Sequence, residues 1–522
     1  MRRKAWIVVL GLIIAAGLIA LPALAKEKVL IVGQGAEPIT LDPQNATDNP
    51  SEEVNRHIYD GLVEFDEHLN IKPALAYKWT VSKDGLVWTF YLRKGIKFHS
   101  GAEFDAYAVK KNFDRIITKR LRRTALYKPF IKEIKVIDKY TVQFILKIPF
   151  GAFLHHLAHG AGLILDPTYI DKNADIKHHP SGTGPFIFKE WIPGDHITLV
   201  ANKNYWKGKP KIDKIIFKTI PEDTSRTMML ETGELDIAER VSPFDIPRLK
   251  KNKDIVVSIT PSLRVIYILM NTQEEIFKDV RVRQALNYAV DREAICKNIL
   301  KGLAEPANGP LAPLTWGYAD IKKYTYDPEK AKKLLAEAGW KDVDGDGILE
   351  KDGKKFIVQL ATPHGRYLMD YKVAEAVQGY LSNIGIKAKL WTADWATYLA
   401  KLRKPVDKAT HELALLGWAP STGDADWVLR PLFATNMWAP IGGNRAFYSN
   451  KEVDKLIEEG MKTVDPKKRA EVYRKAQEII IHDAPWIFLH VQKDVIGYRK
   501  KVHGVVELPI EILIVKNAWI ED

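Results

Sequence analysis

Short apolar runs alternate with amphipathic segments along most of this chain. Continuous or alternating apolar runs, which are typical of buried strands, occur at 28–34, 87–92, 263–272 and 411–418. Apolar residues at helical spacing occur between them, at 52–66, 106–116, 277–300 and 325–340. Strands that alternate with helices predict an α/β fold.

The first segment has a pattern of its own. Arg2, Arg3 and Lys4 precede an apolar run over 5–21, and a small-x-small site ends at Ala25. This order predicts a secretory signal peptide over 1–25, and an uncleaved membrane anchor is the alternative because the run is long enough to span a bilayer. Lys26 stands where a lipoprotein needs cysteine, so we expect an exported protein in the periplasm or at the cell surface.

Composition narrows the class of protein. A chain of 522 residues is too long for one core, so at least two domains are expected, and 46% hydrophobic with 27% charged residues is ordinary for a soluble globular protein. Cys296 is the single cysteine, so no internal disulfide is possible. The formal charge is +13, or +10 without the three basic residues of the signal, but the lysines are scattered. Nucleic acid is therefore not an expected partner.

The densest candidate chemistry lies in 417–433, GWAPSTGDADWVLRPLF. Pro420 and Gly423 disfavour a continuous helix, so we expect a loop that contacts a ligand. A linker whose tryptophans fill the core is the alternative. The side chains that point to binding are two indoles, two hydroxyls and two carboxylates: Trp418, Ser421, Thr422, Asp424, Asp426 and Trp427.

Other motifs point weakly to metals. His155 and His159 have the spacing of one helix face, but no third ligand is apparent. Asp342, Asp344 and Asp346 resemble a calcium loop, yet Gly353 stands where a bidentate glutamate belongs, so an acidic turn without metal is favoured. No metal site, cofactor or catalytic triad is expected, and the chain is not predicted to be an enzyme.

Several of these stretches together resemble one family. The Gly-Trp strand end running into Ser-Thr-Gly-acid-Ala-Asp-Trp is similar to the cleft segment of family 5 extracellular solute-binding proteins, which serve peptide, nickel and glutathione importers. The likeness is strongest to glutathione-binding proteins. The runs that support it are LDP to YDGL (41–62), 79–116, 179–206 and 277–300.

This resemblance implies a periplasmic-binding-protein-like fold. Two α/β lobes would be joined by a two-strand hinge, with an extra subdomain in lobe I. The implied boundaries are lobe I over 26–262 with the inserted subdomain at about 63–180, lobe II over 263–488, and a return to lobe I over 489–522.

The resemblance also suggests roles for single residues. Tyr59 would face the cleft or fill the core, Arg123 would hold a ligand carboxylate, and Arg264 would lie near hinge and cleft. Asp424 or Asp426 would hold an ammonium between walls formed by Trp418 and Trp427. Peptide-binding relatives have an aspartate three residues after the Gly-Trp tryptophan, where this chain has Ser421. That departure weakens a general peptide reading.

The implied function is capture of a glutathione-like peptide for an ABC permease and ATPase by a protein expected to be monomeric. Dipeptide or oligopeptide binding is the main alternative, and a nickel chelate or sugar is a weaker one. A secreted enzyme, a chaperone and a sensory receptor are less favoured classes.

Overall fold

The computed structural model describes residues 27–172 and 174–521. The predicted signal peptide lies outside these residues. Within them, no helix combines the length and the apolar character needed to cross a bilayer.

One large sheet runs through the molecule. Its order is β17-β16-β18-β12-β19-β11-β1-β10-β9-β8, with β13 (Ala304–Pro306) paired to β19. At one end lie β16 (Ile357–Ala361), β17 (Lys387–Trp391) and β18 (Leu413–Trp418). At the other lie β1 (Val29–Gln34), β8 (Phe186–Ile192), β9 (His196–Ala201), β10 (Lys214–Thr219) and β11 (Ile237–Ala238).

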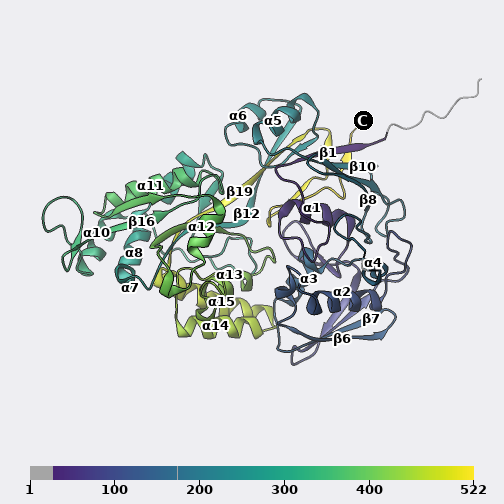
Figure 1. The fold of residues 1–522 in the computed structure, drawn as a ribbon, viewed down its shortest axis with the longest axis horizontal. Helices are drawn as coiled ribbons and strands as arrows, with labels where there is room; N and C mark the ends of the chain where they lie inside the picture. The colour runs from purple at the N-terminus through teal and green to yellow at the C-terminus, as the bar shows by residue number, and fades with distance from the viewer. Residues whose placement is uncertain (1–26, 173, 522) are drawn as a thin grey trace, which may run out of the picture.

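Two long antiparallel strands connect these ends. β12 (Ile255–Met270) and β19 (Trp486–Arg499) pass between the two halves in Figure 1. Their register shifts between Pro261 and Val265, where proline has no N–H for the ladder. The predicted fold class, two α/β lobes joined by a two-strand hinge, is confirmed. The predicted boundaries at 262/263 and 488/489 fall inside these strands and remain predictions.

Lobe I contains α1 (Asn49–Ile58) and an additional small sheet. That sheet has the order β4-β5-β7-β6, formed by β4 (Ala76–Val81), β5 (Val87–Leu92), β6 (Ile131–Asp138) and β7 (Thr141–Leu146). The helices α2 (Ala106–Thr118) and α3 (Phe153–Ala158) accompany it (Figure 1). These elements form the extra subdomain of lobe I. The short helices α4 (Pro167–Asp171), α5 (Asp223–Thr232) and α6 (Ile246–Leu249) complete this half.

Lobe II is built from helices around β16, β17 and β18. Asp327 begins α10 as predicted, because its carboxylate accepts a hydrogen bond from the Lys330 amide. Cys296 is buried here, and burial raises the pKa of its thiol to about 12. The helices are α7 (Glu275–Lys278), α8 (Val280–Ala289), α9 (Arg292–Ala294), α10 (Pro328–Glu337), α11 (Asp370–Ser382), α12 (Trp395–Leu402), α13 (Asp426–Phe433), α14 (Lys451–Lys462) and α15 (Pro466–Asp483).

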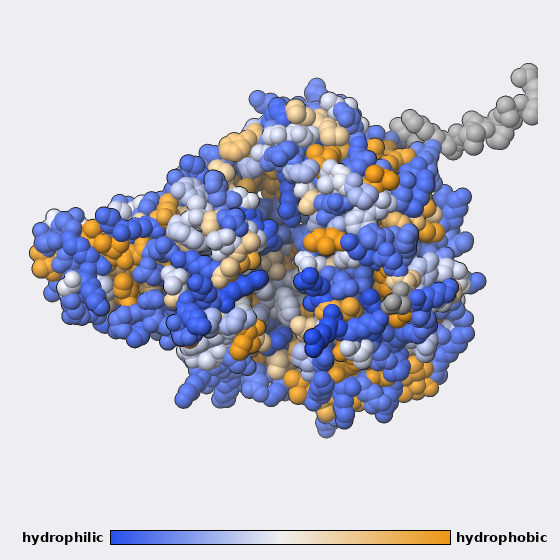
Figure 2. Space-filling model, in the orientation of Figure 1, coloured by the Kyte–Doolittle hydropathy of each residue, from blue (hydrophilic) through white to orange (hydrophobic). Residues whose placement is uncertain are grey.

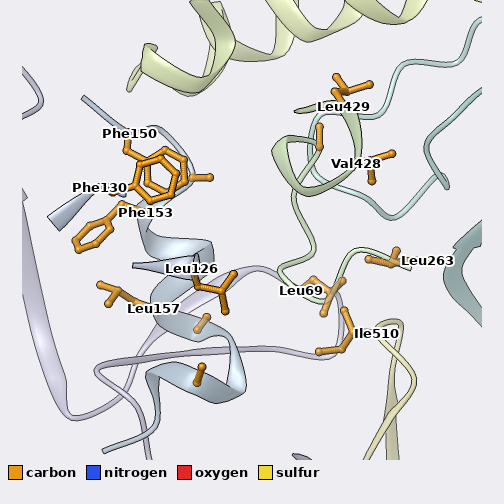
Figure 3. Close-up of a cluster of buried hydrophobic side chains, with 14 of the residues drawn as sticks. Leu69, Leu126, Phe130, Phe150, Phe153, Leu157, Leu263, Val428, Leu429 and Ile510 are labelled. Carbon is orange, nitrogen blue, oxygen red and sulfur yellow. The ribbon is translucent and has the colours of Figure 1, made fainter. Parts of the chain in front are cut away.

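The subdomain packs directly against lobe II. A single hydrophobic cluster includes side chains of both, such as Phe153 and Leu157 on one side and Val428 and Leu429 on the other (Figure 3). The Gly151 amide donates to the Met461 carbonyl at 2.9 Å across the same interface. The lobes therefore touch on this side in the structure.

Two sequence expectations are corrected here. The segment 417–433 is not a loop throughout, because α13 begins at Asp426 and includes Pro431. Pro431 cannot donate to the Trp427 carbonyl one turn earlier, and the Trp418 indole N–H donates to that carbonyl instead, at 2.9 Å. His159 lies beyond the end of α3, so it does not share a helix face with His155.

Candidate ligand-binding cleft

The segment after β18 lies at the interface between the lobes, with its main charges already paired. Asp424 is 0% exposed, and its two oxygens accept hydrogen bonds from Arg469 at 2.6 and 2.7 Å. Burial raises the pKa of Asp424, but Arg469 and the nearby His155 outweigh it, so the pKa lies below its usual value. The carboxylate is thus held as an anion inside the protein.

The neighbouring side chains are also engaged. Asp426 is buried and binds Arg430 within α13, with the shortest contact at 2.6 Å. Trp427 packs edge-on against His156 at 5.7 Å between ring centroids. The Thr422 hydroxyl is the exception, because it is buried without a hydrogen-bond partner in the described part of the chain.

Histidines of the subdomain meet this segment. His159 Nδ1 accepts from the Ala161 amide, so in the neutral ring Nε2 carries the hydrogen and donates to the Ser421 hydroxyl at 3.2 Å. His155 Nδ1 lies 3.4 Å from Asp424. The segment therefore joins the two lobes, and ligand contact by its residues remains a prediction.

The other predicted site residues are dispersed. The Tyr59 hydroxyl donates to the Leu41 carbonyl at 3.0 Å, and its side chain lines a separate cavity of about 350 Å³ in lobe I. Arg123 donates to the Ala46 carbonyl at 2.6 Å and helps to lower the pKa of His159. Arg264 does lie at the hinge, but its fork binds Glu511 at 2.5 and 2.6 Å. Contact between these three residues and a ligand is likewise untested.

A cavity of about 410 Å³ lies beside the hinge, between the lobes. Figure 2 shows the molecule hollowed between its two halves. Lobe I contributes 221–223, Arg226 and 240–243, the hinge contributes Arg264 and 492–495, and lobe II contributes Leu303 and 365–368, with Glu511 completing the wall.

The lobe II wall presents a guanidinium held in place by its surroundings. The Asp370 carboxylate accepts hydrogen bonds from the amides of Gly365, Arg366 and Tyr367, all at 2.9 Å. The Arg366 guanidinium lies over the ring of Trp395 at 5.2 Å. Among residues 27–172 and 174–521 it forms no ion pair, and it acts on Glu511 only at longer range, so its planar fork is available to a ligand carboxylate.

Acidic side chains also line the cavity, beside the cations Arg226, Arg240 and Lys493. Asp494 and Glu511 line the cavity, and Glu507, Glu239 and Glu53 continue the row into lobe I. Burial raises the pKa values of Asp494, Glu507, Glu239 and Glu53, and repulsion from neighbouring carboxylates adds to it for Asp494, Glu507 and Glu53. Arg264 keeps the pKa of Glu511 low against the effect of burial. One oxygen each of Asp494, Glu507 and Glu239 is buried without a partner in the described structure.

The sequence reasoning missed these residues. A usable signal existed for Arg366, because it follows the carboxyl end of β16, which pairs in parallel with β17 and β18. Ligands of open α/β sheets bind at such ends. The acidic row has no such signal, since its members come from segments far apart in the chain.

The acidic turn in lobe II is a separate feature. Carboxylate oxygens of Asp342, Asp344 and Asp346 lie within 4.8 Å of one another, and the three residues are exposed. The Lys355 ammonium contacts Asp346 and lies 2.8 Å from Asp344. This lysine therefore supplies positive charge inside the turn.

Two lobes, a hinge of two strands and an interlobe cavity lined by charged side chains define a two-lobed binding protein. The chain matches the model of bacterial extracellular solute-binding proteins, family 5, over residues 70–439. It belongs to this family, whose members are solute-binding proteins of ABC importers.

Relatives and solved structures agree with this assignment. The chain is 38% identical to the glutathione-binding protein GsiB of Salmonella choleraesuis over 97% of this chain and 96% of the relative. It resembles the oligopeptide-binding protein AppA of Bacillus subtilis in complex with a nonapeptide (TM-score 0.76, 30% identity, 95% of this chain and 100% of the other). It also resembles NikZ of Campylobacter jejuni in complex with Ni(L-His) (TM-score 0.77, 27% identity, 92% and 95%).

Proposed function

We propose that this protein captures a small zwitterionic peptide of the glutathione type in the cavity beside the hinge and delivers it to an ABC importer. The observation that carries the proposal is the polarity of that cavity. Arg366 on lobe II forms no ion pair with a carboxylate in the described chain, and Asp494 lines the same cavity. Glutathione carries an ammonium beside one carboxylate and a second carboxylate at its far end, so it offers groups for both an arginine fork and an acidic side chain.

The size of the cavity supports a short peptide. At about 410 Å³ it lies toward the small end of ligand pockets, which run from about 300 to 1,000 Å³. The relatedness to glutathione-binding proteins points the same way. Because the chain also resembles AppA and NikZ, dipeptides, oligopeptides and nickel chelates are the alternative solutes.

The transport cycle follows from the two-strand hinge. A solute that contacts both lobes favours the closed state, because it gains more interactions there than in the open state. A membrane permease with its ATPase would recognise the closed, loaded form. We propose that the protein acts as an exported monomer without catalytic activity, released from or held by its N-terminal segment.

Calorimetry with three solutes tests the proposal. The protein without residues 1–25 is titrated with glutathione, with a dipeptide mixture and with a nickel–histidine complex. We expect glutathione to bind most tightly and to raise the melting temperature. Tighter binding of dipeptides would transfer the assignment to peptide import, tighter binding of the chelate to nickel import, and no binding of any of the three would refute the peptide assignment.

A further inference from the structure

A groove of about 590 Å³ on lobe I shares no lining residue with the cavity beside the hinge. Residues 77 and 92–96 of the subdomain line it, together with Trp206 from the rest of lobe I. The charged side chains among these described lining residues are Arg93 and Lys94, so both charges are positive and no carboxylate lines the groove. Such a lining favours an anion.

The Arg93 guanidinium is held in position without being neutralised. Its Nε donates to the Ala74 carbonyl at 2.8 Å, and its central carbon lies 5.2 Å from the centre of the Trp206 ring. The Trp206 ring is fixed in turn, because its indole N–H donates to the Asp60 carboxylate at 2.9 Å. Within the described chain Arg93 forms no ion pair, and its two terminal nitrogens donate no hydrogen bond. This fork can therefore bind two oxygens of one anion.

The surroundings of Arg93 are positively charged as well. Lys94 makes no ion pair or hydrogen bond with the described residues, and its ammonium lies 5.4 Å from the centre of the Tyr140 ring. Of the carboxylates beside the groove, Asp60 is held by Trp206, and Glu64 accepts from Lys207 at 2.5 Å. These two carboxylates are thus already bound, whereas the two cations of the groove are not.

The aromatic rings of the groove indicate which anion it fits. Tyr77 is 52% exposed there, and Trp206 is half-buried. Tyrosine and tryptophan beside basic residues are typical of surfaces that meet lipid headgroups, because their rings have an apolar body and a polar tip. A lipid phosphate offers two oxygens to an arginine fork. We propose that this groove binds the phosphates of anionic lipids and docks lobe I on the membrane that holds the permease.

The inference goes beyond the proposed function, since it holds for any solute in the cleft. Sedimentation with lipid vesicles tests it on the mature protein that the sequence predicts, residues 26–522. We expect this protein to bind vesicles made of equal parts phosphatidylglycerol and phosphatidylcholine, to bind pure phosphatidylcholine vesicles much less, and to be released by salt. Arg93→Met and Lys94→Gln should each weaken binding to the anionic vesicles about five-fold. Binding of glutathione should not change in either variant.

Lys401→Gln is the matched control for Lys94→Gln. The Lys401 ammonium also lies over an aromatic ring, 4.7 Å from the centre of Trp391, but it belongs to lobe II and does not line the groove. This variant should bind the anionic vesicles as the wild-type protein does. Equal weakening in Lys401→Gln and Lys94→Gln would show that total charge alone attracts the vesicles, and the inference would be overturned.

Melting temperatures check that the variants fold. Arg93→Met loses the hydrogen bond to Ala74, so it should melt at a somewhat lower temperature. Lys94→Gln should melt as the wild-type protein does, because it removes no hydrogen bond or ion pair within the described chain. Lys94→Gln therefore decides the test even if Arg93→Met does not fold. Wild-type affinity of Lys94→Gln for the anionic vesicles would overturn the inference.

A soluble phosphate separates the two sources of this anion. Glycerol phosphate is titrated into the wild-type protein and into Lys94→Gln by calorimetry. If it binds and the variant weakens it, while vesicles do not bind, the groove serves a soluble phosphate and membrane docking is overturned. Failure of both vesicles and glycerol phosphate to bind also overturns it. Vesicle binding that is weakened in Lys94→Gln, without any binding of glutathione, would support the inference although the proposed function had failed.

Discussion

The segment 417–433 and the cavity beside the hinge both lie where the lobes meet. The carboxylates of the segment are paired within the protein, whereas charged groups of the cavity are not. Asp424 and Asp426 of the segment each bind an arginine of lobe II. In the cavity, Arg366 has no carboxylate partner in the described chain and Asp494 has a buried oxygen without a donor. Paired charges hold an interface together, whereas unpaired ones are free to recognise a solute. A dense polar motif in a sequence therefore indicates an interface, but it does not show whether the other side is a ligand or another part of the same chain.

Lowering the pH should have the largest effect of the series, because it destabilises the protein through the histidines that contact the segment 417–433. Burial lowers the pKa values of His155, His156 and His159, that of His156 to about 4. Between this value and the ordinary 6.5 the unfolded chain binds more protons than the folded one, so the unfolding free energy falls as pH falls. His156 alone should lower the unfolding free energy by about 3 kcal/mol by pH 4.

Urea denaturation at a series of pH values measures this effect. His156→Gln should flatten the dependence. The raised pKa values of the acidic row act with the opposite sign, because those carboxyls take up protons in the folded state and gain stability as pH falls from neutral. A wild-type stability that does not fall below pH 6.5 would mean that the acidic row outweighs the histidines.

Asp424→Asn should have the next largest effect. It leaves Arg469, 1% exposed, without its counterion, and breaking a buried pair costs about 3–5 kcal/mol. Chemical denaturation of the unliganded protein is the measurement. Glu478→Gln, which removes the partner of Arg474 in an exposed pair, should cost less than about 1 kcal/mol. Equal stability of Asp424→Asn and wild type would show that Asp424 is available to a ligand.

Arg366→Met should affect binding and not folding. Loss of a charge-assisted hydrogen bond would weaken binding of glutathione by about 1.5–3 kcal/mol. The melting temperature of the unliganded protein should stay the same, since Asp370 still holds the backbone amides of the loop. Calorimetry and thermal melting measure the two quantities. An exposed control, Arg474→Met, should change neither one.

Ser421→Ala should have the smallest effect of the series. It removes the hydroxyl that accepts from His159 Nε2, a neutral hydrogen bond worth about 0.5–1.5 kcal/mol. Denaturation of the unliganded protein measures the loss. A loss of binding without any loss of stability would instead assign Ser421 to the solute.

The sequence was sufficient for the architecture and for part of the site. Apolar runs located β1, β12 and β18, and Asp327 located the start of α10, because these depend on neighbouring residues. The family resemblance supplied the hinge and the subdomain. The loop predicted from Pro420 and Gly423 was wrong from Asp426 on, where α13 begins. That helix includes Pro431, and the Trp418 indole N–H bonds to the carbonyl that proline leaves free.

Pairing of charges depends on distant residues and could not be predicted. Arg469, in the run DPKKRAEVYRKA, looks like one of several solvated cations, yet it is the partner of Asp424. Arg264 looks free in the sequence, yet it binds Glu511, which is 247 residues away. Such pairs are set by tertiary packing, so the free guanidinium of Arg366 became apparent only in the folded structure.

The burial of Cys296 makes this molecule convenient for spectroscopy. Its thiol stays protonated at neutral pH because its pKa is about 12, and a protonated thiol reacts slowly with maleimides. Cysteines introduced on either side of the cavity would then take up fluorescent dyes selectively in an otherwise unmodified chain. The approach of the two lobes could be followed in single molecules by energy transfer without first removing the native thiol.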